Sequence, residues 1–380
     1  MRRWSGLPIV VALLLAVVTG CSQIGGGSNS GNIVFGVSGP LTGPNAEYGQ
    51  IWKKAFDIAV EEVNAKGGIK GRKIEYQFED TQSDPKQSVV VAEKFVNDKR
   101  IVAEIGDFAS PASMAASPIY ERAGLVQFGF TNSHPDFTKG GNYMFSTAPN
   151  QTADAPFLAN FAVKDIGMKK LVLLHLNTDW GKTTADLFEG KAKELGAQIV
   201  YRDAYLPDEK DFKTIITKAR DANPDGLALM SYYTDAALIA QQARAQGLNA
   251  AIIANGATYS PKFMELGGEA VEGAATTSTF FSGNPRPEVQ SFVKKYKERY
   301  NNEEPNTFAA NAYDAIMILA HVIEKVGTDR KAIRDGMAGL KDAPSIVFEK
   351  VAFGEDRRVV INEFTRLKVQ GGQFVLWKAS

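Results

Sequence analysis

The sequence predicts a two-lobed α/β protein in which each lobe is built on a doubly wound parallel sheet. Short apolar runs alternate with amphipathic helical stretches along most of the chain, which is the pattern of a parallel sheet covered by helices. The alternation restarts after Pro149-Asn150-Gln151, so the chain contains two such series. Its 380 residues also exceed what one hydrophobic core usually holds.

The first βαβ unit opens with an apolar run at 33–37 that has the length of a buried strand. After a loop rich in Gly and Pro, apolar residues recur at helical spacing from Ile51 to Val63, and Gly67-Gly68 ends this helix. Residues 73–79 then alternate between apolar and polar, as a strand does. A right-handed crossover makes the two strands parallel.

The same periodicities predict the remaining elements. The first series continues with helices at 85–98 and 110–122 and strands at 101–105 and 125–130. The second series has helices at 154–166, 182–195, 212–222, 235–246 and 261–266, and strands at 170–176, 198–206, 226–230, 251–254 and 274–279. The tail breaks the alternation, with helices at 289–300, 308–326 and 330–340 and extended pieces at 346–353, 362–369 and 374–377.

The N-terminus has the features of a secretory leader, predicted at residues 1–20. Arg2 and Arg3 precede an apolar run that is shorter than a membrane-spanning helix requires. The run ends in Val18-Thr19-Gly20-Cys21, which resembles a bacterial lipoprotein box and makes Cys21 the expected lipidation site. An ordinary signal peptide with an incidental cysteine is the alternative. Residues 21–31 are rich in Gly and Ser and are expected to form a flexible tether.

Charge and cysteine content exclude several classes of protein. Lys plus Arg and Asp plus Glu each number 43, so the formal net charge is zero. This balance argues against binding of nucleic acid or of an acidic membrane through a basic face. Cys21 is the single cysteine, so neither an intrachain disulfide nor a cysteine-based metal site is expected.

The sequence offers no catalytic constellation, so we expect neither an enzyme nor a bound cofactor or metal. His134, His175 and His321 are far apart and lack metal-ligand spacing. The motifs of a nucleophile elbow, a phosphate-binding P-loop and a dinucleotide-binding turn are all absent.

A binding site is better supported, at the strand-to-helix junction formed by residues 108–113. Ser110 is a good N-cap and Pro111 a good first helical residue. Free backbone N–H groups and the helix dipole make such a junction a small anion site that suits a carboxylate. A plain N-cap without a ligand is the alternative.

The chain resembles the branched-chain amino-acid-binding proteins of ABC importers. The resemblance is carried by GPLTGPNAEYGQ, NAKGGIKGRKIE and EDTQSDPKQSVVVAEKFV near the N-terminus, by Asp179-Trp180-Gly181, and by residues 242–248. It implies the type I periplasmic-binding-protein fold, whose lobes are joined by a three-strand hinge. The crossings would lie near Gln151, Ser282 and Val359. The first lobe would then contain 32–151 and 282–358, and the second 152–281 and 359–380.

The resemblance also implies a ligand site. Ser110 matches the family residue that holds the ligand α-carboxylate, and Thr131 and Ser133 match the other carboxylate and ammonium contacts. All three follow parallel strands, at the sheet edge where open α/β sheets bind ligands. Three aromatic residues match positions that close over an apolar ligand side chain: Tyr48, Trp180 and Tyr232.

Two positions depart from the family pattern. Ser83 and Ala109 stand where the family often has a disulfide, so packing must supply the lost stability. Gly256 stands where the family has an acid that pairs with the ligand ammonium, and an unpaired buried ammonium is costly. Either Asp107 or another acid takes its place, or the ligand is an acid or amide without an α-ammonium.

The sequence therefore predicts a monomeric, lipid-anchored solute-binding protein on the outer side of a bacterial membrane. It would capture a branched-chain amino acid or a related small carboxylate by hinge closure and deliver it to an ABC permease. A sensor of the same fold and a secreted α/β enzyme are the alternatives.

Overall fold

The computed structural model of the protein describes residues 31–361 and 363–379, and Asn32–Ser380 forms one compact unit. The predicted signal peptide, Cys21 and all of the predicted tether except Gly31 lie outside the described residues. Within the described ranges, no helix is both long enough and apolar enough to cross a membrane.

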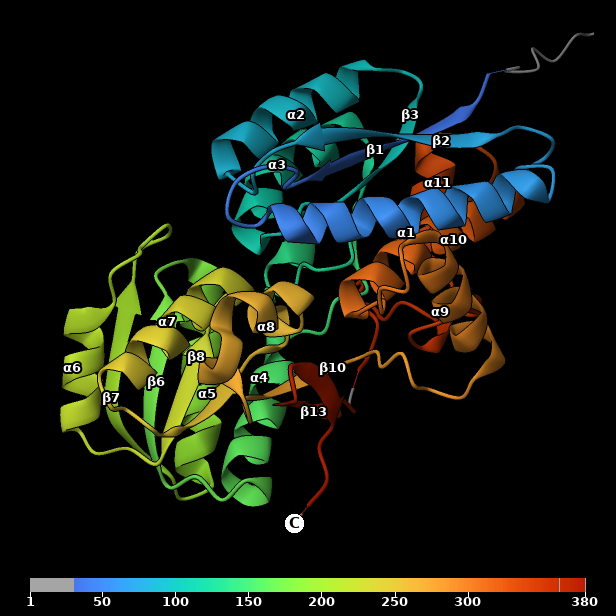
Figure 1. The fold of residues 1–380 in the computed structure, drawn as a ribbon. Coiled ribbons are helices and arrows are strands. Elements are labelled where there is room, and N and C mark those ends of the chain that lie inside the picture. Colours follow the sequence, from blue (N-terminus) through green and yellow to red (C-terminus); the bar gives the residue numbers. More distant parts are fainter. Residues whose placement is uncertain (1–30, 362, 380) are drawn as a thin grey trace, which may run out of the picture. The chain divides into compact units, whose positions relative to one another are not determined.

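The first half of the fold is built on a five-stranded, fully parallel sheet with the order β2-β1-β3-β4-β5 (Figure 1). Its strands are β1 (Ile33–Gly39), β2 (Ile74–Asp80), β3 (Ile101–Ile105), β4 (Val126–Gly129) and β5 (Met144–Ser146). All seven residues of β1 are buried. Phe35 belongs to one apolar cluster and its neighbour Val34 to another, because helices cover both faces of the sheet.

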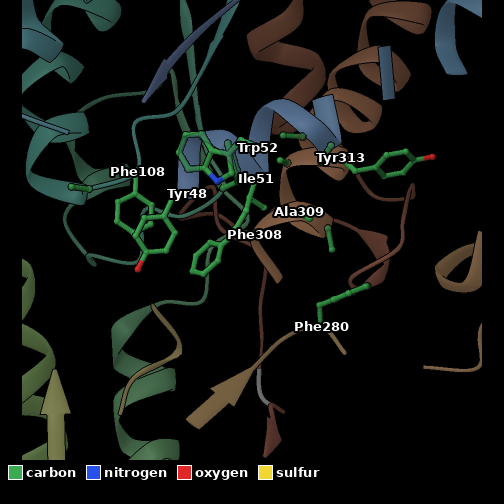
Figure 2. Close-up of a cluster of buried hydrophobic side chains, with 14 of the residues drawn as sticks. Tyr48, Ile51, Trp52, Phe108, Phe280, Phe308, Ala309 and Tyr313 are labelled. Carbon is green, nitrogen blue, oxygen red and sulfur yellow. The ribbon is translucent and has the colours of Figure 1, made fainter. Parts of the chain in front are cut away.

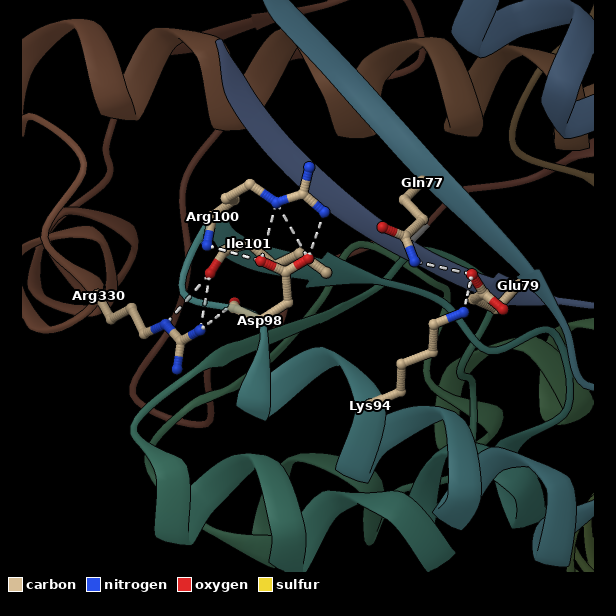
Figure 3. Close-up of polar contacts among 7 residues, drawn as sticks. All are labelled: Gln77, Glu79, Lys94, Asp98, Arg100, Ile101 and Arg330. Carbon is tan, nitrogen blue, oxygen red and sulfur yellow. Dashed lines mark hydrogen bonds and ion pairs between the residues drawn. The ribbon is translucent and has the colours of Figure 1, made fainter. Parts of the chain in front are cut away.

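Six helices complete this first half: α1 (Ala46–Ala65), α2 (Pro85–Asn97), α3 (Ser110–Ala123), α9 (Pro287–Arg299), α10 (Thr307–Val326) and α11 (Arg330–Ala338). The last three come from the tail of the chain, and α10 packs along α1. Arg330 fixes α11 to the sheet, since its guanidinium donates to the carbonyls of Ile101 (2.9 Å) and Asp98 (3.1 Å) (Figure 3). At another point of this half, Lys94 of α2 pairs with Glu79 of β2 at 2.7 Å (Figure 3).

The second half is built on a seven-stranded sheet with the order β14-β13-β10-β9-β8-β6-β7. Its parallel strands are β6 (Lys170–Leu176), β7 (Gln198–Tyr205), β8 (Gly226–Met230), β9 (Ala251–Ala254) and β10 (Ala275–Ser278). At one edge, β13 (Thr365–Gln370) and β14 (Gln373–Leu376) add an antiparallel hairpin. Gly371-Gly372 forms the turn between them, and both glycines have positive φ.

The helices of the second half are α4 (Gln151–Asn160), α5 (Asp179–Glu194), α6 (Lys213–Asp221), α7 (Tyr233–Ala245) and α8 (Pro261–Gly267). Short turns of helix complete it: η2 (Phe161–Asp165), η3 (Gly256–Thr258) and η4 (Gly268–Val271). Two small features belong to neither of the large sheets. They are the 3₁₀ turn η1 (Phe137–Gly140) and a two-stranded sheet of β11 (Ala343–Ser345) and β12 (Glu349–Val351). The two-lobed α/β prediction is thus confirmed, although the second sheet is mixed rather than purely parallel.

The chain passes between the two halves three times, at 147–150, 279–286 and 352–364. The third segment pairs with the end of β5, directly before the first segment. The Ser146 N–H donates to the Arg357 carbonyl (3.0 Å), and the Val359 N–H donates to the Ser146 carbonyl (3.1 Å). Such paired, strand-like connections leave a few backbone angles to absorb a rotation of one half against the other.

Hydrogen bonds occupy the place of the missing disulfide. Ser83 Oγ donates to Asp107 Oδ1 (2.8 Å), and Ser88 Oγ and Thr81 Oγ1 donate to Asp107 Oδ2. Asp107 is fully buried, and this burial raises the pKa of its carboxyl despite the hydrogen bonds. Hydrogen bonds therefore accompany packing at this position.

Candidate functional site

A cavity opens where the strand ends of both sheets meet, and its volume is about 100 Å³. A buried water needs about 10–15 Å³ on this measure, so the space corresponds to roughly seven to ten water-sized positions. The walls are formed by residues from both halves: Phe108, Ser110, Phe130, Thr131, Ser133, Ala148, Pro149, Gln151, Asp154, Trp180, Thr184, Tyr232, Asn255, Gly256, Ala257, Thr277, Ser278, Thr279, Thr307, Phe308, Asn311 and Phe364. Five of the six ligand-contact residues that we inferred from the sequence are among them.

Ser110 contributes a hydroxyl to the cavity, but it is not the N-cap that the sequence predicted. Helix α3 begins one residue earlier, with Ala109 as the N-cap, so Ser110 is its first residue. Its Oγ accepts from the His134 N–H (3.3 Å), which leaves the hydroxyl hydrogen without an acceptor among the described residues. The Ser110 hydroxyl can therefore donate to a carboxylate.

The loop after β4 brings Thr131 and Ser133 to the same wall. Ser133 Oγ accepts from Trp180 Nε1 (2.9 Å) and so keeps its own hydrogen for a ligand. Thr131 Oγ1 donates to the carbonyl of Phe108 (3.1 Å), so it presents lone pairs rather than a hydrogen. Ser110 and Ser133 thus offer hydroxyl hydrogens to the cavity, and Thr131 offers an acceptor oxygen.

A buried arginine holds this loop in place. The Arg358 guanidinium donates to the carbonyls of Asn132 (3.1 Å) and His134, which flank Ser133. Burial lowers the pKa of Arg358 to about 10, which still leaves it charged at neutral pH. Because Arg358 lies on a segment that links the two halves, the position of the loop is tied to the hinge.

The aromatic wall comes mainly from the second half. The rings of Trp180 and Tyr232 stack with centroids 4.9 Å apart, and Phe108 tilts against Tyr232 at 5.1 Å. Burial raises the pKa of Tyr232, so its phenol stays protonated. These rings form an apolar surface that suits an apolar ligand side chain.

Tyr48, which we placed in the pocket from the sequence, lies behind this wall. Its fully buried ring stacks on Phe108 at 3.8 Å and meets Phe308 edge-on at 4.8 Å (Figure 2). Its hydroxyl donates to the Ala257 carbonyl at 2.6 Å. Tyr48 therefore links the first half to the second instead of lining the cavity.

Further hydrogen bonds join the two halves around the cavity. Tyr233 Oη and Thr234 Oγ1 both donate to the carbonyl of Pro44, at 3.0 and 3.1 Å. Asn306 Nδ2 donates to the Tyr259 carbonyl at 3.0 Å. These contacts exist only while the halves are together.

Sequence reasoning missed several polar residues of the lining, above all Asp154, Thr277 and Asn311. Asp154 lies in the first turn of α4, where an acid is usual and so gives no signal. Asn311 had a weak signal, because it is a polar residue within the largely apolar helix α10. Thr277 lies on β10 and donates to Asp154 Oδ1 at 3.3 Å.

Position 256 has no room for the expected acid. A Cβ added to Gly256 would lie 2.9 Å from the Thr277 carbonyl oxygen, closer than real Cβ atoms approach. Asp107, the substitute that we considered, is not part of the lining and its oxygens are already occupied by hydroxyl donors. Asp154 is the acidic residue of the lining.

The comparisons with known proteins agree with this architecture. Residues 32–373 match the model of the "Periplasmic binding protein" family. The Leu/Ile/Val-binding protein homolog 1 of Brucella suis is 31% identical over 307 residues, which are 80% of this chain and 81% of that protein.

Solved structures are similar over nearly the whole chain. The leucine-binding protein LivK of Thermotoga maritima is 28% identical with a TM-score of 0.85, and the match covers 91% of this chain and 98% of that one. The branched-chain amino-acid transporter substrate-binding protein LivJ of Streptococcus pneumoniae, solved with isoleucine, is 26% identical with a TM-score of 0.85 and coverage of 90% and 97%. The chain therefore belongs to the branched-chain amino-acid family of ABC-transporter substrate-binding proteins, which have the type I periplasmic-binding-protein fold.

Proposed function

We propose that the protein is an extracytoplasmic solute-binding lipoprotein of an ABC importer that captures a branched-chain amino acid or a related small carboxylate. The observation that carries this proposal is the composition of the cavity. The free hydroxyl hydrogens of Ser110 and Ser133 lie on one wall, and the stacked rings of Trp180 and Tyr232 form another. A small ligand with a carboxylate and an apolar side chain satisfies both walls.

Capture works by closure of the two halves around the ligand. We assign 32–151 and 282–358 to one lobe and 152–281 and 359–380 to the other, so that the bond between Ser133 and Trp180 crosses the cleft. A ligand bridging both walls stabilises the closed arrangement and shifts a pre-existing equilibrium toward it. A permease that reads the closed arrangement would then accept only the loaded protein.

The test of the carboxylate wall is the double variant Ser110→Ala with Ser133→Ala. Each hydrogen bond to a charged group contributes about 1.5–3 kcal/mol, so both together should weaken binding by about 100-fold or more. Isothermal titration calorimetry with L-leucine, L-isoleucine and L-valine measures the change.

The matched control is Ser117→Ala. Ser117 is buried on the same helix, but its hydroxyl donates to Gln127 Oε1 (2.6 Å), and it is not among the cavity residues. It should alter stability and not affinity. Equal affinities for the double variant and the unaltered protein would refute the carboxylate site.

A further inference from the structure

The cavity contains a carboxyl group without a cationic partner. Asp154 is flanked by the Thr277 hydroxyl at 3.3 Å, a long hydrogen bond that supplies only a neutral donor. None of the residues that line the cavity is Lys, Arg or His. A carboxylate in such a site is costly unless a bound molecule brings the positive charge.

Two amide oxygens of the same lining also lack donors. Gln151 uses its NH₂ group on the Trp180 carbonyl (2.8 Å) and on Thr184 Oγ1, which fixes the amide orientation and leaves Oε1 unpaired among the described residues. Asn311 likewise donates to the Thr307 carbonyl (2.9 Å), and its Oδ1 has no donor within the described part of the chain. Both side chains are more than nine-tenths buried.

Asp154 and Asn311 are both connected to the end of β10, and Gln151 lies one helical turn before Asp154 on α4. Asp154 bonds to Thr277 on that strand. Just beyond it, Thr279 Oγ1 lies 3.1 Å from Thr307 Oγ1, which in turn accepts from Asn311 Nδ2 at 3.2 Å. The hydroxyl donors Ser110 and Ser133 come from other elements, α3 and the loop after β4. Gln151 links the two groups, because its backbone N–H donates to the Ser133 carbonyl (3.0 Å) while its side chain lies on the same helix as Asp154.

We propose that Asp154, assisted by the side-chain oxygens of Gln151 and Asn311, binds a protonated primary amine of the ligand and replaces the acid that position 256 cannot hold. An ammonium group carries one positive charge and three N–H donors, which matches one carboxylate and two unpaired oxygens. A carboxylate without an amine would instead add a second negative charge to a cavity without a cation. The inference rests on the proposed function and narrows its ligand to amino acids.

The test compares ligands that differ only in the amine, using the full chain purified in detergent. Calorimetry is run with L-leucine, L-isoleucine and L-valine and with the same carbon skeletons lacking the amine, such as 4-methylpentanoate. The unaltered protein should bind at least one amino acid about 100-fold more tightly than its deaminated counterpart. This comparison needs no variant and is independent of folding effects.

Asp154→Asn keeps the size of the side chain and removes its charge, and it should weaken amino-acid binding by about 100-fold. The control is Asp165→Asn, because Asp165 lies in the same run of helix and pairs with Arg366 at 2.7 Å, outside the lining. It should leave affinity unchanged.

Three outcomes overturn the inference, and they separate it from the proposed function. Equal binding of an amino acid and its deaminated acid, or full affinity in Asp154→Asn, refutes the amine site while carboxylate capture stands. Absence of binding to all six compounds refutes both.

Discussion

Asp154 carries an ionisable group that titrates close to neutrality. Burial raises the pKa of its carboxyl to about 6. Below that pH the group is neutral and cannot pair with an ammonium, so a proton competes with the ligand. Affinity for an amino acid should therefore be constant above about pH 7 and fall as the pH drops, by about tenfold between pH 7.5 and pH 5.

Calorimetry at a series of pH values measures this dependence. Asp235 and Asp314 lie outside the cavity lining, but burial also raises the pKa of each to about 6, so their titration changes stability over the same range. Tyr232, the other titratable group of the lining, stays protonated throughout. The Asp154→Asn variant isolates the effect, since its residual affinity should not vary. A sloping profile in that variant would assign the pH dependence to another group.

At the scale of elements, helix α1 and the turn η3 meet through one hydroxyl. Tyr48→Phe removes the 2.6 Å bond to the Ala257 carbonyl and keeps the ring stacked on Phe108. Because this bond exists only when the halves are together, its loss should speed ligand dissociation. A net hydrogen bond contributes about 0.5–1.5 kcal/mol, which corresponds to about two- to tenfold in affinity.

Stopped-flow fluorescence measures the dissociation rate. Tyr76→Phe is the control, because the Tyr76 hydroxyl bonds to Asp57 within the first half and should leave ligand release unaffected. Identical rates in Tyr48→Phe and the unaltered protein would mean that the bond does not contribute to closure.

Element prediction succeeded where one periodicity governed a long segment and failed where it did not. Strand β1 and helix α10 follow from their apolar patterns, whereas β5 has only three residues and gives no pattern.

Ser110 and Ser133 could be inferred from a family motif. The role of Asp154 could not, because it depends on Thr277 and Asn311, which lie more than a hundred residues away along the chain and meet it only after folding.

At the scale of the whole molecule, the proposed lipidation of Cys21 would hold the protein at the membrane. We predict that Cys21→Ala releases the protein from the membrane, because the proposed lipidation site is then lost and no described helix spans a bilayer. Fractionation of cells into membrane and soluble material measures the change, with Ser22→Ala as the control. A Cys21→Ala protein that still sediments with membranes would exclude the lipid anchor.

Hydrogen bonds of Ser83 and Ser88 to Asp107 lie where relatives often have a disulfide, so this part of the fold does not depend on cysteine oxidation. Cys21 is the only cysteine, so the chain from Gly31 onward contains no thiol and its folding is independent of redox conditions. It can be produced in a reducing cytosol, and dithiothreitol should not change its melting temperature.

One engineered cysteine at exposed Thr152, beside the cavity residue Gln151, would then be a unique attachment point for a maleimide dye. The labelled protein would be a fluorescent biosensor for its own ligand.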